Sequence, residues 1–176
     1  MKKSENEYYT LAIDPGNEQT AYCLLSPSLF PIKFAKKENE EVILDILDIL
    51  CNTNFMPLQV PIEHIECFGM PAGKTLFETA YFIGRLTEII SHSADVYKIY
   101  RHEEKMYLCH SMKANDATIK QALVDRFAPN EPNHGKGSKE NQGYFYGFKA
   151  DVWSAFAIGV TFRDKWETKK GKLEGD

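Results

Sequence analysis

Residues 11–16 constrain the fold of this chain more than any other stretch. They read Leu-Ala-Ile-Asp-Pro-Gly, an apolar run that ends in a carboxylate and then turns. Pro15 restricts Asp14 to extended backbone, and Gly16 can adopt the angles that a tight turn requires. A second apolar run, residues 20–25, follows at once. The pattern predicts a hairpin with Asp14 at the exposed end of its first, buried strand.

The rest of the chain alternates between strand-like and helix-like patterns. Period-2 and short apolar runs predict strands over residues 8–14, 20–26, 30–35, 58–68 and 95–100. Apolar residues at helical spacing predict helices over residues 38–50, 75–91, 103–109, 115–126 and 149–166. Residues 130–147 are rich in Gly, Asn, Lys and Pro, which predicts a flexible loop. This order predicts one α/β domain over residues 1–176, with a mixed sheet flanked by helices.

Charge is distributed unevenly along the chain. The 176 residues carry a net charge of −4, which by itself argues against a nucleic-acid partner. However, residues 96–149 contain nine Lys or Arg against six Asp or Glu, whereas residues 1–95 contain seven against 14. We therefore expect the middle-to-late region to face DNA. The four cysteines are scattered, and no secretory or membrane-spanning pattern is present, which predicts a cytoplasmic protein.

Three acids stand where chemistry is expected. Asp14 ends the first strand, Glu66 lies near the end of the strand over residues 58–68, and Asp151 opens the last helix. Converging carboxylates repel one another unless cations neutralise them, and their hard oxygens suit Mg²⁺ or Mn²⁺. Each acid also has an explanation without catalysis. Asp14 fits a turn, Glu66 an exposed strand position and Asp151 a helix start. Glu63 competes with Glu66 because both follow an isoleucine, and spacing alone does not decide between them.

The motifs resemble, in order, those of the RuvC-like Holliday-junction resolvases, particularly their bacteriophage branch. Residues 13–16 match the opening Ile-Asp-Pro-Gly, and residues 65–70 resemble the Ile-Glu-x-x-x-Met strand end. The helix that follows runs to Ile-Gly-Arg-Leu at 83–86. Residues 113–119 resemble the lysine-rich helix start, and residues 147–157 resemble the carboxyl-terminal acidic helix.

The resemblance implies an RNase H-like fold, a homodimer and Mg²⁺-dependent cleavage of four-way or other branched DNA. It implies catalytic and metal-binding roles for Asp14, Glu66 and Asp151, and so selects Glu66 over Glu63. It also names the helix over residues 75–91 as the dimer interface. One departure concerns Ser154, three residues after Asp151, where many family members carry an acid or a histidine. Coordination of a second metal is therefore left open.

Candidate DNA contacts surround these motifs. Phe68 occupies the region where the family inserts an aromatic side chain into the junction, although it could equally belong to the core. The candidate phosphate contacts are Arg101, Lys113, Lys136, Lys139 and Lys149. The aromatic residues at 144–146 and 148 either stack on unpaired bases or anchor their loop to the core.

The sequence predicts a metal-dependent endonuclease that cleaves branched DNA, leaving a 5′-phosphate and a 3′-hydroxyl. Preference for flaps or forks over four-way junctions remains open at this stage. A non-catalytic junction-binding module of the same fold is an alternative. An actin-like or sugar-kinase ATPase also opens with a strand, an Asp and a Gly-containing turn. That class needs two RNase H-like lobes, for which 176 residues leave no room.

Overall fold

The centre of the molecule is a five-stranded mixed sheet. The computed structural model describes residues 8–67, 69 and 71–173, with side chains to residue 168. The strand order is β3-β2-β1-β4-β5. The strands are β1 (Tyr9–Asp14), β2 (Gln19–Leu25), β3 (Pro31–Glu38), β4 (Leu58–His64) and β5 (Asp95–Tyr100). β1, β2 and β3 are antiparallel neighbours, whereas β1, β4 and β5 run parallel. The predicted mixed sheet with a parallel portion is confirmed.

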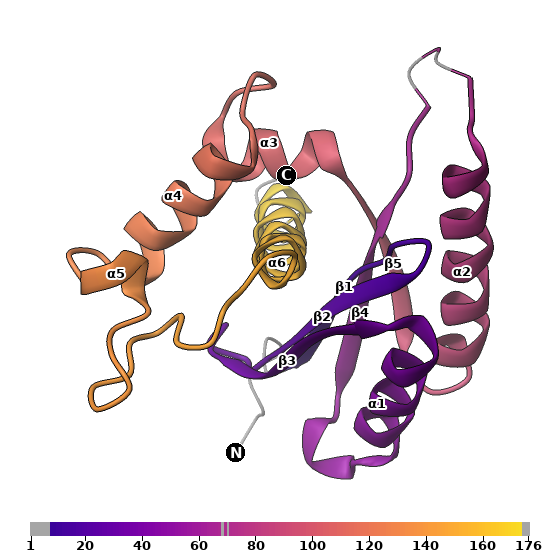
Figure 1. Cartoon of the computed structure of the whole chain (residues 1–176), viewed down its shortest axis with the longest axis horizontal. Helices are drawn as coiled ribbons and strands as arrows, with labels where there is room; N and C mark the ends of the chain where they lie inside the picture. The colour runs from indigo at the N-terminus through magenta and orange to yellow at the C-terminus, as the bar shows by residue number, and fades with distance from the viewer. Residues whose placement is uncertain (1–7, 68, 70, 174–176) are drawn as a thin grey trace.

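Helices cover both faces of this sheet (Figure 1). On one face lie α1 (Asn39–Cys51) and α2 (Lys74–Ser91), joined to the strands by the short helix η1 (Thr53–Phe55) and by loops. The other face carries α6, which contacts β1 and β2 and is itself contacted by α3 and α4. The helices on this side are α3 (Arg101–Cys109), α4 (Asp116–Phe127) and α6 (Val152–Leu173). The four-residue α5 (Pro132–Gly135) lies between α4 and α6 in the chain.

Strand alternation divides the core into two layers. In β1, Leu11 and Ile13 point toward α1 and α2, so the intervening Ala12 points toward α6. Asp14 shares the parity of Ala12 and therefore lies on the α6 face. Gly159 lets α6 approach that face closely, because a Cβ there would lie 2.5 Å from Leu25 Cδ1. The sheet consequently presents the carboxylate of Asp14 toward the start of α6.

Two element boundaries differ from the sequence predictions in ways that matter for the site. β4 ends at His64, so Glu66 lies beyond the strand, and Phe68 falls outside the described residues. α6 begins at Val152, so Asp151 precedes the helix instead of lying in its first turn. The reason is local: the φ of Ala150 is +38°, which no regular helix accommodates.

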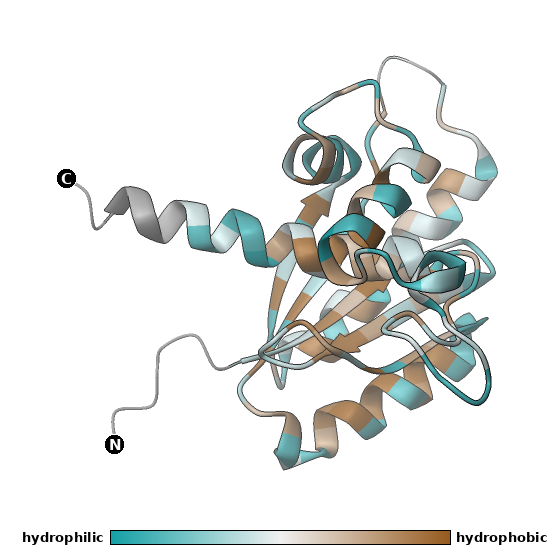
Figure 2. Cartoon of the chain, turned by 90° about the vertical axis from the view of Figure 1, so that its left-hand side faces the viewer, coloured by the Kyte–Doolittle hydropathy of each residue, from teal (hydrophilic) through white to brown (hydrophobic). Residues whose placement is uncertain are grey.

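α6 runs along the sheet and projects beyond the body of the fold toward the C-terminus (Figure 2). Its buried side chains belong to the half that crosses the sheet, from Val152 to Arg163. Within the described residues, the helices are each too short or too polar to cross a membrane.

Candidate active site

Asp14 and Glu63 lie side by side on neighbouring parallel strands. Ile13 of β1 pairs in register with Ile62 of β4, so the next residue of each strand is also adjacent. Both carboxylates point to the α6 face, because Ile13 and Ile62 belong to the opposite core layer. The ends of two strands thus hold two acids together.

Asp151 reaches the same place from the start of α6. Its backbone carbonyl accepts the hydrogen bond from Ala155 N at 2.9 Å, so the residue caps the helix. Its carboxylate forms an ion pair with Lys36 of β3, with Lys36 Nζ 2.6 Å from Asp151 Oδ2. The helix start therefore brings a third acid, already paired with a lysine, to the sheet end.

Neighbouring carboxyls influence the pKa of Asp14. Burial is the largest cause that raises the pKa of Asp14 well above its usual value. The Glu63 carboxyl comes next, through repulsion and hydrogen bonding, followed by repulsion from Asp151 and Glu104. Four carboxyls thus contribute to one cluster, which we call the acid cluster: Asp14, Glu63, Glu104 and Asp151.

Glu104 is the member that sequence reasoning missed. It lies in α3 and its side chain is fully buried. Burial and the Glu63 carboxyl raise the pKa of Glu104 to about 8, although Arg101 acts in the opposite direction. Arg101 Nη1 donates to Glu104 Oε2 at 2.6 Å, and the other Glu104 oxygen, Oε1, has no hydrogen-bond partner among the described residues.

Glu66, which the resemblance favours over Glu63, lies outside this cluster. Its Oε2 is 2.9 Å from Nδ1 of His102 in α3, and it is not among the carboxyls that raise the pKa of Asp14. The structure places Glu63 beside Asp14 because β4 ends at His64 and carries Glu63 within the ladder. Which glutamate serves as the metal ligand stays a prediction, and the geometry favours Glu63.

The acid cluster suits a hard divalent cation in its chemistry. Carboxylate oxygens are the ligands that Mg²⁺ and Mn²⁺ prefer, and a cation would relieve the repulsion that raises the pKa of Asp14. In the part of the chain that the structure describes, however, His, Cys, Asp and Glu side chains form no group of three close enough to hold a metal ion. Lys36 and Arg101 occupy oxygens of Asp151 and Glu104. Cation binding at the cluster would therefore require these ion pairs to rearrange.

The candidate DNA contacts fall into separate places. Lys136, Lys139 and Lys149 line one cavity between α5 and the start of α6. Arg101 lines another, together with Asp151 and Ser154, but it is already paired with Glu104 and Asp116. Lys113 is exposed just before α4. Their contacts with DNA stay predictions.

One signal in the sequence would have found Glu63. Leu58, Val60 and Ile62 alternate as one apolar face of β4, so Glu63 must point to the opposite face, as Asp14 does in β1. Lys36 and Glu104 left no comparable signal, because they come from a sheet strand and a helix whose packing against α6 is set by tertiary contacts.

Comparison with solved structures bears on the fold. A Thermus thermophilus RuvC in complex with a Holliday junction substrate superposes with a TM-score of 0.67. The match covers 92% of this chain and 96% of that chain at 13% sequence identity. The chain has the RuvC fold. A second T. thermophilus RuvC structure gives the same TM-score and coverage at 12% identity. No protein-family model and no curated protein sequence matches the chain. The RuvC-like fold predicted from the motifs is confirmed, and the bacteriophage branch stays a prediction.

Proposed function

We propose that this protein is a metal-dependent endonuclease that cleaves Holliday junctions and related branched DNA. The observation that supports the proposal is that the Glu63 and Asp151 carboxyls both raise the pKa of Asp14 at one end of a RuvC-like sheet. A structural role alone would not favour several acids at one buried site, because each raises the cost of ionising Asp14. Such arrangements are typical of functional sites.

The reaction would be hydrolysis of one phosphodiester. A water oxygen bonds to phosphorus, the bond from phosphorus to the 3′ oxygen breaks, and the 3′ oxygen takes up a proton. The products carry a 5′-phosphate and a 3′-hydroxyl. Asp14 and Glu63, adjacent on β1 and β4, would orient the attacking water opposite the leaving oxygen.

Asp14, Glu63 and Asp151 would hold Mg²⁺, with Mn²⁺ as a substitute, and Glu66 remains the alternative glutamate. A bound divalent cation would activate the water and stabilise charge on the leaving oxygen. Lys36, released from Asp151, would lie beside the scissile phosphate and contribute a positive charge there. Ser154 stands near Asp151 in the cavity that Arg101 lines, and a hydroxyl is a poorer ligand than a carboxylate.

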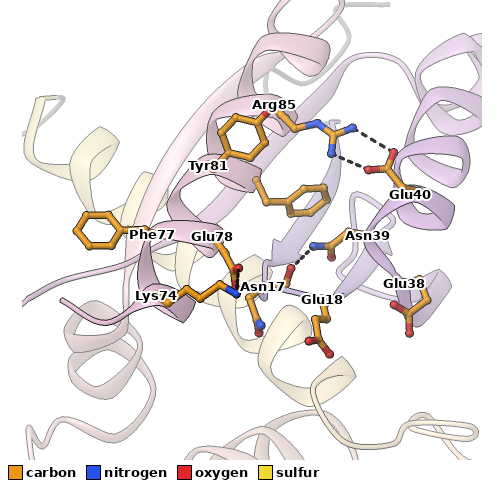
Figure 3. A pocket seen from close by; sticks show the side chains of 11 residues that line it. Asn17, Glu18, Glu38, Asn39, Glu40, Lys74, Phe77, Glu78, Tyr81 and Arg85 are labelled. Carbon is orange, nitrogen blue, oxygen red and sulfur yellow. Dashed lines mark hydrogen bonds and ion pairs between the residues drawn. The ribbon is translucent and has the colours of Figure 1, made fainter.

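We also propose a homodimer that uses α2. Phe77 and Tyr81 of this helix are 65% and 72% exposed, which is unusual for large aromatic side chains. Figure 3 shows these two residues beside a hollow of about 810 Å³ between α2 and the start of α1, closed on one side by the ion pair of Arg85 with Glu40. A second hollow continues along α2 past Tyr81. Exposed aromatic rings of this kind are suited to contact with a second copy of the chain, and two copies would present two acid clusters to the two symmetric strands of a junction.

Two alternatives share the fold. A nuclease that prefers flaps or forks would use the same acids on a different branched DNA. A non-catalytic junction-binding module would bind DNA without cutting it, and the retained acid cluster is the observation against it.

A cleavage assay separates these functions. End-labelled four-way junction, three-way junction, flap and linear duplex are incubated with the protein and Mg²⁺. The proposal expects symmetric nicks across the four-way junction and little cutting of linear duplex. Equal cutting of linear duplex would contradict structure-selective cleavage, and junction binding without cleavage in Mg²⁺ or Mn²⁺ would favour the binding module.

The variant that tests the cluster is Asp14→Asn. We expect it to bind the junction but to cut at least about 1,000-fold more slowly, because it loses a ligand and a charge at the reacting phosphate. Asp95→Asn, at the opposite end of the parallel strands, is the matched control and should cut at the wild-type rate.

A further inference from the structure

The segment between α4 and α6, predicted as a flexible loop, is anchored by its own aromatic residues. Phe145 and Phe148 are fully buried, and Tyr144 Oη donates to Leu29 O at 2.7 Å. Gly135 packs so closely that a Cβ there would lie 2.5 Å from Ala128 Cβ. An isolated bridge between Gly137 and Gln142 closes the tip of the segment. These contacts fix the positions of the residues between the anchors.

Those residues build a basic cavity of about 370 Å³, which we call the lysine pocket. Its polar lining comes from Asn133, Lys136, Ser138, Lys139, Tyr146 and Lys149. No acid lines it, and within the described part of the chain none of its three lysines forms an ion pair. In a chain whose net charge is −4, three lysines around one cavity constitute a site for anionic groups.

Tyr146 differs from its aromatic neighbours. Its side chain is 37% exposed, whereas Phe145 and Phe148 beside it have no exposed surface. In the residues that the structure covers, it packs against no other aromatic ring. The ring is therefore partly exposed where it lines the lysine pocket, and a planar apolar group can stack on it there.

The lysine pocket adjoins the acid cluster. Lys149 precedes Asp151 by two residues, and the intervening Ala150 ends the turn into α6. The ring of Phe148 packs on Phe34 of β3, with ring centroids 4.7 Å apart, and Phe34 is two residues from Lys36. Lys36 in turn pairs with Asp151. A DNA strand that crosses the acid cluster would therefore continue into the lysine pocket.

We propose that the lysine pocket binds an unpaired nucleotide of the DNA strand that adjoins the cleaved phosphodiester. Tyr146 stacks on its base, and Lys136, Lys139 and Lys149 contact its phosphates. This inference rests on the proposed nuclease function and deepens it. Stacking on an aromatic ring tolerates any base, but a base can stack on Tyr146 only when it has left its own base stack in the duplex. The pocket would thus select branched DNA with an unpaired nucleotide beside the branch point.

Fluorescence of 2-aminopurine tests the stacking directly. The probe replaces the unpaired base of a branched DNA, and binding is measured in EDTA so that no cleavage occurs. We expect wild-type protein and Tyr146→Phe to quench the probe, because both rings stack. Tyr146→Ala should lose the quench and bind this DNA about 5- to 100-fold more weakly. Equal quench with Tyr146→Ala would overturn the stacking role.

Salt dependence tests the lysines. Affinity for the same DNA is measured at several salt concentrations for wild-type protein and for Lys136→Gln, Lys139→Gln and Lys149→Gln. Each lysine that binds a phosphate should, when replaced by glutamine, reduce the slope of log affinity against log salt by about 0.7. Lys98→Gln, at an exposed position of β5, is the control and should leave the slope unchanged. Unchanged slopes in all three pocket variants would contradict the proposal.

The two proposals fail separately. Wild-type protein that quenches the probe through Tyr146 but cuts no branched DNA in Mg²⁺ would support the lysine pocket and contradict the nuclease. If the protein cleaves the junction but Tyr146→Ala quenches the probe as well as wild-type protein does, the nuclease is supported and the lysine pocket is overturned.

Discussion

The two faces of the sheet are built on different principles. On the face covered by α1 and α2, buried polar groups are partnered: Tyr22 Oη donates to Asp45, and Thr20 Oγ1 donates to Asn39. On the face covered by α6, four buried side-chain atoms in the described residues have no hydrogen-bond partner. They belong to Thr10, Gln59, Glu104 and Thr161.

This difference shows where the fold gains stability and where it gives stability up. An unpartnered buried polar atom costs roughly 1–3 kcal/mol, and a buried acid with a raised pKa adds to that cost. Both costs fall on the α6 face, which also holds the acid cluster. Active sites are commonly strained or destabilised relative to the rest of their fold. The α6 face also buries apolar clusters of its own, and their burial offsets these costs.

The largest expected effect lies on the α1/α2 face. Ile46 of α1 has no exposed surface, so Ile46→Ala should destabilise the fold by about 2–5 kcal/mol through reduced burial and a cavity. Chemical denaturation measures the change. Leu47→Ala, at a neighbouring position that is 41% exposed, should cost much less. Similar losses from both variants would contradict the burial of Ile46 as the cause of its effect.

On the α6 face, removing a charge should stabilise the protein. Glu104→Gln keeps the shape of a side chain whose pKa burial raises to about 8. The folded state holds a proton on Glu104 that the unfolded state releases above about pH 4–5, so the wild-type protein loses stability as pH rises toward 8. The variant escapes this loss and should gain about 1–3 kcal/mol at pH 8 but little at pH 4.

Denaturation at both pH values measures this gain. Glu18→Gln, an exposed glutamate, is the control and should show no such pH dependence. A gain from Glu104→Gln that is equal at pH 4 and pH 8 would mean that the buried charge is not its source.

The smallest expected effect comes from comparing one buried threonine on each face. Thr161 of α6 is fully buried with an unpartnered Oγ1, so Thr161→Val should stabilise the protein by about 1 kcal/mol. Thr79 of α2 is 7% exposed, and its Oγ1 donates to Thr75 O at 3.0 Å. Thr79→Val removes a made hydrogen bond and should be neutral or destabilising. Thermal denaturation of both variants measures the two changes. A stabilising effect of Thr79→Val would contradict the difference between the two faces.

Local pattern was enough to predict most of the fold. Short apolar runs placed β1 and β2, and helical spacing placed α1, α2 and α4 within a residue or two of their observed bounds. The turn at Pro15 and Gly16 put Asp14 at a strand end, where the structure has it. These features depend on residues that are neighbours in the sequence, so they can be predicted from the sequence.

The site could be predicted less well from the sequence, because tertiary contacts bring its residues together. Whether Glu63 or Glu66 enters the site depends on where β4 ends, and the ion pairs of the site depend on how β3 and α3 pack around α6. Lys36 meets Asp151 across more than 100 residues of chain, and Glu104 becomes buried only through the fold. Residues 130–147 have the composition of a loop, and the sequence left open whether their aromatic residues stack on bases or anchor the segment. The burial of Phe145 depends on tertiary packing, and it anchors the segment.

The most direct test of the acid cluster compares two glutamates in one assay. Wild-type protein, Glu63→Gln and Glu66→Gln are given the same end-labelled four-way junction in Mg²⁺, and the rates of nicking are measured under single-turnover conditions. We predict that Glu63→Gln loses at least about 100-fold in rate, because Glu63 lies beside Asp14, whereas Glu66→Gln loses far less. A wild-type rate from Glu63→Gln would contradict the assignment of the acid cluster as the cutting centre.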